Sequence, residues 1–313
     1  MRATRLALLV AVMAAALVIQ PASAPSAPQA VTFDLCAKEG TVSLPGGASA
    51  PIWGFVTKPA ATACSDGALT PTLPGPQLTV GVGDSVTLNV TNALPAGHTI
   101  SIEAPGIAFD PGASDAAPGA TVSRTFTATA AGTYLYTSAG SGGRQQAMGL
   151  YGALVVRPET AAGYELERTL VLSEIDPGLN ADPDGFPMVD WAPTYWLING
   201  KAHPATDTLD VHAGDHLLLR YVNAGLEHVT MTMLGRDTHV VARDAYPLAN
   251  PLDVVAQTIP AGATADGIVT IPASAGAGDR YPLYNRQLHL TNGAVGYPAH
   301  SPGGMLTFIR VVP

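Results

Sequence analysis

Residues 78–94, LTVGVGDSVTLNVTNAL, are repeated in divergent form by residues 209–225, LDVHAGDHLLLRYVNAG. In both stretches, apolar and polar side chains alternate around a Gly-Asp dipeptide, Gly83-Asp84 in the first copy and Gly214-Asp215 in the second. This pattern is typical of two β-strands joined by a tight turn. The copies start much further apart than the units of a solenoid, so the sequence predicts two similar domains in tandem.

The turns and strands around these copies resemble the multicopper oxidase family, whose domains are cupredoxin-like (plastocyanin-like) β-sandwiches. The shared motifs of the first half are Pro74-Gly75-Pro76, Asn92-Ala93-Leu94, Pro118-Gly119, Gly132-Thr133-Tyr134-Leu135-Tyr136 and Met148-Gly149-Leu150-Tyr151-Gly152. Those of the second half are Leu197-Ile198-Asn199-Gly200 and Arg220-Tyr221-Val222-Asn223-Ala224. The resemblance implies an all-β chain with two cupredoxin-like Greek-key β-sandwich domains in tandem.

The expected boundaries begin with a signal peptide at residues 1–24. Arg2 and Arg5 precede an apolar run, and Ala22-Ser23-Ala24 has the form of a signal-peptidase cleavage site. We expect a flexible leader at 25–30, the first domain at 31–158, a linker at 159–167 and the second domain at 168–313. The protein is therefore expected to be secreted or periplasmic, and the apolar run is too short to span a membrane.

Strands are expected throughout, because the chain has 33 Gly and 27 Pro residues that punctuate short alternating segments. The expected strands of the first half are 52–56, 77–81, 85–91, 122–129, 133–137 and 150–156. Those of the second half are 169–173, 194–198, 208–212, 216–222, 229–234, 267–271, 282–290 and 304–311. Helix signals are almost absent.

The histidines that hold copper in the family are missing from the first half. The family motif His-Trp-His-Gly falls on Glu103-Ala104-Pro105-Gly106, so Glu103 and Pro105 replace two histidines. The motif Tyr-x-Tyr-His-x-His falls on residues 134–139, where Thr137 and Ala139 replace the other two. Copper oxidases need imidazole and thiolate ligands. The chain is therefore predicted to be a divergent member that lacks the copper-ligand histidines and cysteine.

The second half gives one partial match. The family motif His-x-x-His-x-His-Gly falls on residues 229–235, which contain no histidine, and His228 is one place out of register. His300 and Met305 have the spacing of the family's final His and Met, but the cysteine of that motif is absent. We interpret this pair as a coincidence or a relic, with Met305 in a closing core strand. His300 and Met305 remain the copper candidates.

Cys36 and Cys64 are the two cysteines of the chain. An even number of cysteines in an exported chain favours a disulfide. The alternative is a metal-ligand role, but no histidine-rich segment surrounds either residue. The sequence thus predicts a Cys36–Cys64 disulfide.

Two other patterns suggest metal sites. Asn180, Asp182 and Asp184 precede Gly185 as in the start of an EF-hand loop, but position 12 would be Trp191 instead of Glu. A solvated acidic loop is the alternative to a calcium site. His212 and His216 flank the Gly-Asp turn of the second copy, where surface histidines are the ordinary interpretation.

Together these observations predict an exported protein that has lost its copper centres and has a structural or binding role. An enzyme is not the favoured interpretation. The alternative is a laccase-like copper oxidoreductase with unrecognised ligands, and copper would then be its cofactor; otherwise none is predicted. The formal net charge of −9 argues against nucleic acid as a partner. The expected partner is another protein or a component of the cell envelope, and the sequence does not specify the oligomeric state.

Overall fold

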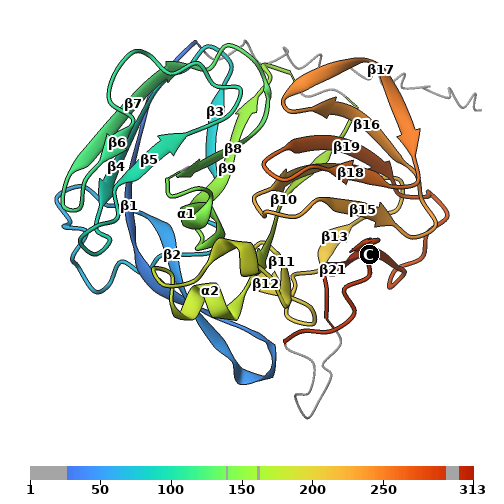
Figure 1. Cartoon of the computed structure of the whole chain (residues 1–313). Helices are drawn as coiled ribbons and strands as arrows, with labels where there is room; N and C mark the ends of the chain where they lie inside the picture. The colour runs from blue at the N-terminus through green and yellow to red at the C-terminus, as the bar shows by residue number, and fades with distance from the viewer. Residues whose placement is uncertain (1–26, 139, 161–162, 294–302) are drawn as a thin grey trace, which may run out of the picture.

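The computed structural model describes residues 27–138, 140–160, 163–293 and 303–313, so the expected signal peptide lies outside the described residues. Strands dominate the described residues, and Figure 1 shows them gathered in two lobes that lie side by side. The all-β prediction is confirmed. The described ranges contain no helix long and apolar enough to cross a membrane.

The first lobe is built from two sheets. One has the order β2-β1-β4-β7, and the other has the order β3-β9-β8-β5-β6. The strands of the first sheet are β1 (Ala30–Ser43), β2 (Ser49–Thr57), β4 (Ser85–Asn92) and β7 (Thr121–Thr127). The strands of the second are β3 (Leu78–Gly81), β5 (Ile100–Glu103), β6 (Asp115–Ala116), β8 (Gly132–Ser138) and β9 (Tyr151–Arg157).

The second lobe repeats this plan with extra strands. Its sheets have the orders β12-β11-β10-β14-β19-β16-β17 and β13-β21-β20-β15-β18. The first contains β10 (Leu166–Ile175), β11 (Tyr195–Ile198), β12 (Lys201–Ala202), β14 (His216–Asn223), β16 (Thr238–Arg243), β17 (Tyr246–Val254) and β19 (Thr264–Thr270). The second contains β13 (Leu209–Val211), β15 (Val229–Met233), β18 (Gln257–Ile259), β20 (Arg280–Asn285) and β21 (Leu306–Val311).

The two copies of the repeat occupy equivalent places in the two lobes. β1 and β4 pair in parallel, as do β10 and β14, and the next neighbours β7 and β19 are antiparallel in both. In the opposite sheets, β3 pairs in parallel with β9, and β13 with β21. The predicted pseudo-symmetry is confirmed: residues 78–94 and 209–225 form β3–β4 and β13–β14.

Equivalent side chains make equivalent hydrogen bonds. Asp84 Oδ2 accepts from the Gly81 amide, as Asp215 Oδ2 accepts from the His212 amide. The intervening glycines, Gly83 and Gly214, have φ of 93° and 90°, a region that favours glycine. These bonds close each turn in the same way, which explains why both copies keep Gly-Asp.

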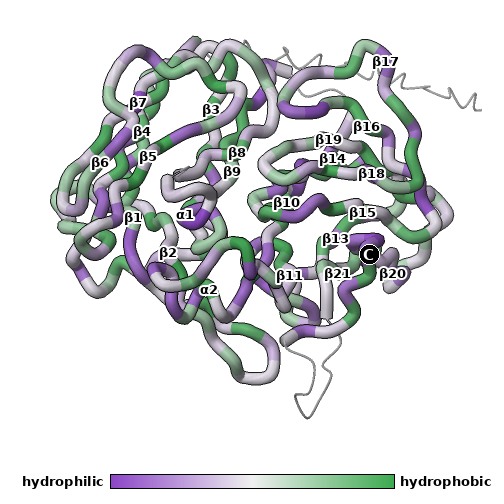
Figure 2. Tube along the Cα trace, in the orientation of Figure 1, coloured by the Kyte–Doolittle hydropathy of each residue, from purple (hydrophilic) through white to green (hydrophobic). Residues whose placement is uncertain are grey.

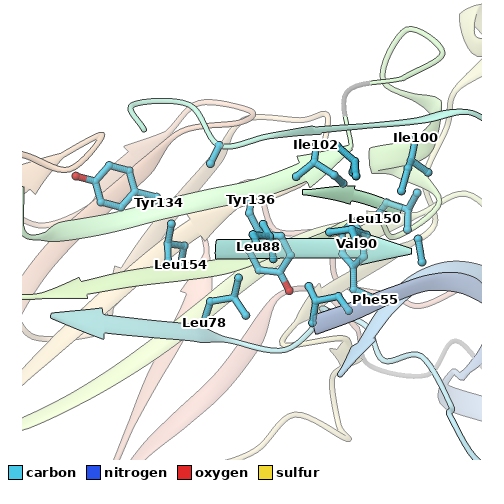
Figure 3. Close-up of a cluster of buried hydrophobic side chains, with 14 of the residues drawn as sticks. Phe55, Leu78, Leu88, Val90, Ile100, Ile102, Tyr134, Tyr136, Leu150 and Leu154 are labelled. Atoms are coloured by element: carbon cyan, nitrogen blue, oxygen red, sulfur yellow. The ribbon is translucent and has the colours of Figure 1, made fainter. Parts of the chain in front are cut away.

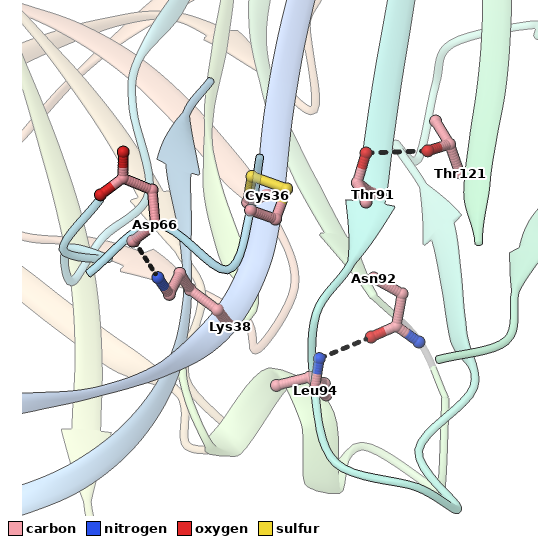
Figure 4. Close-up of a disulfide and its surroundings, with 8 residues drawn as sticks. Cys36, Lys38, Asp66, Thr91, Asn92, Leu94 and Thr121 are labelled. Atoms are coloured by element: carbon pink, nitrogen blue, oxygen red, sulfur yellow. Dashed lines mark hydrogen bonds between the residues drawn. A yellow bond between two sulfur atoms is a disulfide. The ribbon is translucent and has the colours of Figure 1, made fainter. Parts of the chain in front are cut away.

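Asn92 and Asn223 close the other end of each copy. The Asn92 amide donates to the carbonyls of His98 and Ala116, and its oxygen accepts from Leu94 N (Figure 4). Asn223 donates to Glu227 and Ile259 and accepts from Gly225 N. Each buried asparagine therefore ties a strand end to a loop and to the last residue of a short strand, β6 or β18.

Each lobe encloses its own apolar core. Figure 2 shows apolar and polar residues alternating along many strands, which directs one set of side chains inward. In the first core, Leu88 and Val90 on β4 pack with Tyr136 on β8 and Leu154 on β9 (Figure 3). The second core is assembled around β10, β14, β19 and β21. A smaller cluster joins the lobes: Leu135, Tyr151, Ala153, Val171, Val222 and Ala224.

The β16–β17 hairpin adds a second contact between the lobes. Its turn residues Asp244 and Ala245 have positive φ, and Ala245 is buried in the core of the first lobe. A Cβ on Gly132 would lie 2.5 Å from that of Ala245, so the contact requires glycine at position 132.

The predicted disulfide is confirmed. Cys36 on β1 and Cys64 in the loop after β2 are bonded, with Cα atoms 5.6 Å apart (Figure 4). The bond fastens that loop to the centre of a sheet, beside a hydrogen bond from Lys38 Nζ to the Asp66 carbonyl. The described residues contain no free cysteine.

The element limits differ from the expected ones in several places. β1 begins at Ala30, inside the expected leader, and β10 begins at Leu166, inside the expected linker. The strand expected over 282–290 ends at Asn285, whose side chain accepts from Gln287 N and turns the chain. Short helices are found at α1 (Arg144–Ala147), α2 (Pro177–Ala181), η1 (Pro45–Gly47) and η2 (Met188–Asp190).

Candidate functional site

The residues at the family's ligand positions in the first lobe lie on neighbouring strands. Glu103 on β5 and Thr137 on β8 are direct cross-strand partners. Glu103 and Pro105 are exposed, whereas Thr137 is buried and its hydroxyl donates to the Leu150 carbonyl at 2.9 Å. Ala139 lies outside the described residues. The alignment of motifs thus identifies positions that the fold brings together.

A network of neutral hydrogen bonds occupies the adjoining end of the first lobe. Ser138 Oγ donates to Gln145 Oε1 at 2.5 Å, and Gln145 Nε2 donates to the Thr99 carbonyl at 2.8 Å. Ser138 Oγ also accepts from Ser101 N. Ser138 and Gln145 are fully buried, and a Cβ on Gly140 would lie 2.6 Å from Gln145 Oε1. These polar atoms are therefore satisfied by one another and closely packed.

This donor set does not fit copper. A blue-copper or trinuclear centre needs imidazole nitrogens, and the former also needs a thiolate. The hydroxyl of Thr137 and the amide of Gln145 are neutral oxygen and nitrogen groups that are already committed to protein partners. Within the described part of the chain, no group of three or more His, Cys, Asp or Glu side chains is arranged to hold a metal ion.

In the second lobe, the family motif at residues 229–235 falls on β15 and the turn after it, where buried methionines alternate with threonines. Met231 and Met233 on β15 and Met305 just before β21 are buried in the second core. The carbonyl of Met305 accepts from Asn285 N, which continues the pairing between β20 and β21. His300, the other copper candidate, lies outside the described residues. Met305 thus has the environment of a core methionine.

The three calcium candidates have separate environments. Asn180 is on α2 and its amide donates to the Pro51 carbonyl of the first lobe. Asp182 accepts from Gly185 N within the loop, and Asp184 is exposed with one oxygen 3.6 Å from His98 Nε2. The calcium site stays a prediction, because no observation of a bound ion bears on it.

The loop that carries these residues joins the lobes. Arg144 on α1 donates to the carbonyls of Pro183 and Phe186, and Leu179 of α2 is buried in the first core. The segment after β10 thus caps one end of the first lobe, a contact the motifs did not reveal.

His212 and His216 do not converge on a common partner. His212 Nδ1 lies 3.6 Å from Asp215, and His216 Nδ1 lies 3.3 Å from Glu165. All four side chains belong to the surface around the Gly-Asp turn, which agrees with the interpretation of these histidines as surface residues.

A buried ion-pair network lies between the lobes. Arg220 on β14 is paired with Asp266 on β19 at 3.1 Å and with Glu167 on β10 at 3.0 Å. Thr133 of the first lobe joins them, because its hydroxyl donates to Asp266 at 2.6 Å and accepts from Arg220. Burial raises the pKa of Asp266, while Arg220 and Thr133 favour its ionised form.

Glu174 is a second buried acid of the second lobe. It lies at the end of β10, opposite Trp196 on β11, and burial raises its pKa to about 8. Its Oε2 accepts from Leu226 N at 3.0 Å, whereas its Oε1 has no hydrogen-bond partner. Trp196 stacks on His289 with ring centroids 3.8 Å apart. Sequence reasoning missed this cluster, although a Glu at the end of the apolar segment TLVLSEI was an available signal.

The same cross-strand pair exists in the first lobe, where the glutamate is exposed and the tryptophan is buried. Glu39 on β1 pairs with Trp53 on β2, as Glu174 pairs with Trp196. Trp53 contacts His98 with ring centroids 4.5 Å apart. Because Glu39 is exposed, the pseudo-symmetry supplies a natural counterpart in which the carboxyl group remains solvated.

Comparison with known proteins agrees with this architecture. Residues 68–161 match the family model described as "Multicopper oxidase". The chain is 26% identical over 252 residues to multicopper oxidase MmcO of Mycobacterium tuberculosis, an alignment that covers 68% of this chain and 48% of MmcO. It is 29% identical over 229 residues to Laccase-7 of Oryza sativa subsp. japonica, covering 66% of this chain and 40% of the laccase. The chain therefore spans about half the length, or less, of these relatives.

The fold is also that of solved copper proteins. The structure superposes on the blue copper oxidase from Nitrosomonas europaea with a TM-score of 0.76 and 22% sequence identity, covering 90% of this chain and 86% of the oxidase. Residues 68–161 are thus similar to a multicopper oxidase domain, and the chain has a cupredoxin-type fold in both lobes.

Proposed function

We propose that this multicopper-oxidase-like protein is exported, has lost its copper centres and serves a structural or binding role. The observation that carries the proposal is the buried position of Thr137. Its hydroxyl is committed to the Leu150 carbonyl beside Glu103, at two positions where the family has histidine. Thr is a poor copper ligand, and a lone exposed carboxylate cannot replace an imidazole cage.

The neighbouring network supports the same conclusion. Ser138 and Gln145 satisfy one another in a fully buried site, so the end of the lobe is held by hydrogen bonds between protein groups. A fully satisfied buried polar network holds a core in one arrangement without a metal ion. Loss of the copper ligands is thus compatible with a stable first lobe.

Export is supported by two observations of different kinds. The N-terminal segment has the charge and apolar pattern of a signal peptide. The Cys36–Cys64 disulfide is of the kind that persists in an oxidising compartment. The proposed partner is a protein or cell-envelope component, and the acidic charge makes nucleic acid an unsuitable one.

The test is metal loading followed by assay. The purified full-length product is incubated with Cu(II), desalted, and examined for bound copper and for oxidation of a phenolic substrate. We expect neither stoichiometric copper nor turnover. Stoichiometric copper with turnover would overturn the proposal in favour of a laccase-like copper oxidoreductase with unrecognised ligands.

A control variant separates adventitious binding from a true centre. His212→Ala/His216→Ala removes the two exposed histidines of the second Gly-Asp turn. Any weak copper uptake that disappears in this variant without a change in activity supports the proposal, because exposed imidazoles bind copper without forming a redox centre.

A further inference from the structure

The buried Glu174 carboxyl group holds a turn that touches both lobes. Oε2 accepts from Leu226 N in the turn between β14 and β15, and Gly225 packs directly against the carboxyl group. A Cβ at Gly225 would lie 2.0 Å from Oε2, so no side chain fits between them. The position of this turn is therefore coupled to the state of Glu174.

The same turn carries the contact with the first lobe. Gln146 on α1 donates to the Ala224 carbonyl at 3.0 Å, and Ala224 belongs to the apolar cluster shared by the lobes. Movement of residues 224–227 would thus disturb the contact with α1 as well as the end of the second core.

The groups around Glu174 provide no positive charge for its ionised form. Glu227 follows in the same turn and adds negative charge, and Tyr151 of the first lobe is a buried neutral phenol. His289 stacks on Trp196 with its Nε2 3.8 Å from Glu227, and burial lowers the pKa of this histidine. Within the described ranges, no lysine or arginine forms an ion pair with Glu174.

We propose that the protonation state of Glu174 controls the contact between the lobes. Protonated, it stays beneath the turn at residues 224–227 and keeps that turn against α1. Ionised, the carboxylate needs water or another donor besides the backbone amides of the turn, because a buried charge without a cation is costly. The turn then moves aside to admit one, and the contact between Gln146 and Ala224 loosens.

The test is amide hydrogen exchange of the intact protein between about pH 6 and about pH 9, expressed as protection factors so that the intrinsic pH dependence cancels. In the wild type, we expect protection of the 224–227 turn to fall by about tenfold over this range. Glu174→Gln keeps the shape and cannot ionise, so its protection should stay constant. Glu39→Gln alters the exposed counterpart of Glu174 and should behave as the wild type.

Two results would overturn this proposal. One is a wild-type turn whose protection factors do not change with pH, and the other is an equal fall in Glu174→Gln. If Glu174→Gln does not fold, the wild type still decides the matter by NMR. The carboxyl carbon of Glu174 and the amide of Leu226 must then shift together with pH, and titration of one without the other contradicts the proposal.

Discussion

Replacement of Arg220 by methionine should destabilise the protein by about 3–5 kcal/mol, the usual cost of removing one partner from a buried ion pair. The side chain of Arg220 is only 4% exposed and that of Asp266 only 8%. Methionine retains much of the apolar stem but removes the donors to Asp266, Glu167 and Thr133. The cost arises because the buried Asp266 then lacks a cation, whereas Glu167 keeps its ion pair with Arg157.

The measurement is urea denaturation followed by tryptophan fluorescence at neutral pH. The control is Arg310→Met, which breaks the bidentate pair between Arg310 and Asp210 on the surface of the second lobe. Both members of that pair are about half exposed, so solvent and salt screen their attraction. The control should therefore leave the denaturation midpoint nearly unchanged.

Two further results follow from the same reasoning. Asp266→Asn should restore part of the lost stability in the Arg220→Met background, because it removes the orphaned carboxylate. The deficit of Arg220→Met should also shrink in mild acid, where Asp266 can take up a proton. If Arg220→Met and the surface control lose similar stability, the network does not join the lobes energetically and the reasoning is wrong.

Other predictions test the remaining features. Because the pKa of Glu174 is raised in the folded state from 4.5 to about 8, the native protein binds an extra proton between these values. Stability should therefore decline by about 5 kcal/mol as pH rises through this window and then level off; Glu174→Gln should abolish that decline in pH-dependent denaturation, and a retained slope would assign it to other groups. Reduction of the Cys36–Cys64 bond should lower the melting temperature, with a loss of about 3–4 kcal/mol, and an unchanged melting curve after verified reduction would contradict this. Asn92→Ala and Asn223→Ala should each cost about 2–4 kcal/mol in denaturation experiments, because each leaves one buried and one partly buried carbonyl without its donor. A large difference in stability between the two asparagine variants would show that the two copies of the repeat do not contribute equally to the free energy of unfolding.

In the candidate site, the spacing of the motifs predicted some residues and missed others. The spacing predicted that Glu103 and Thr137 occupy ligand positions of the family, and the structure places them opposite each other on β5 and β8. It did not identify Gln145, which lies on the α1 turn and reaches back to Ser138 and Thr99. A glutamine in a polar loop carries no local sign that it will be completely buried.

The strands also divide into those that the sequence predicted and those that only long-range contacts explain. The strand β4 was expected because its alternation is regular, and β14 was expected because it occupies the equivalent place in the second copy of the repeat. β16 and β17 were not expected, and most of β17 is exposed, so its residues alternate little in polarity. Their hairpin exists because β16 pairs with β19 and because Ala245 inserts against Gly132, both of which are long-range contacts.

The sequence by itself determined the repeat, the β-sandwich class and the disulfide, because these depend on local alternation, turn residues and residue identity. The tertiary structure alone decided which charged groups are buried. Glu174 and its counterpart Glu39 face tryptophans in the same register, yet one is enclosed and the other is exposed. That difference depends on the chain segments that fold over each strand end, and burial by distant segments is what sets the pKa of a carboxyl group.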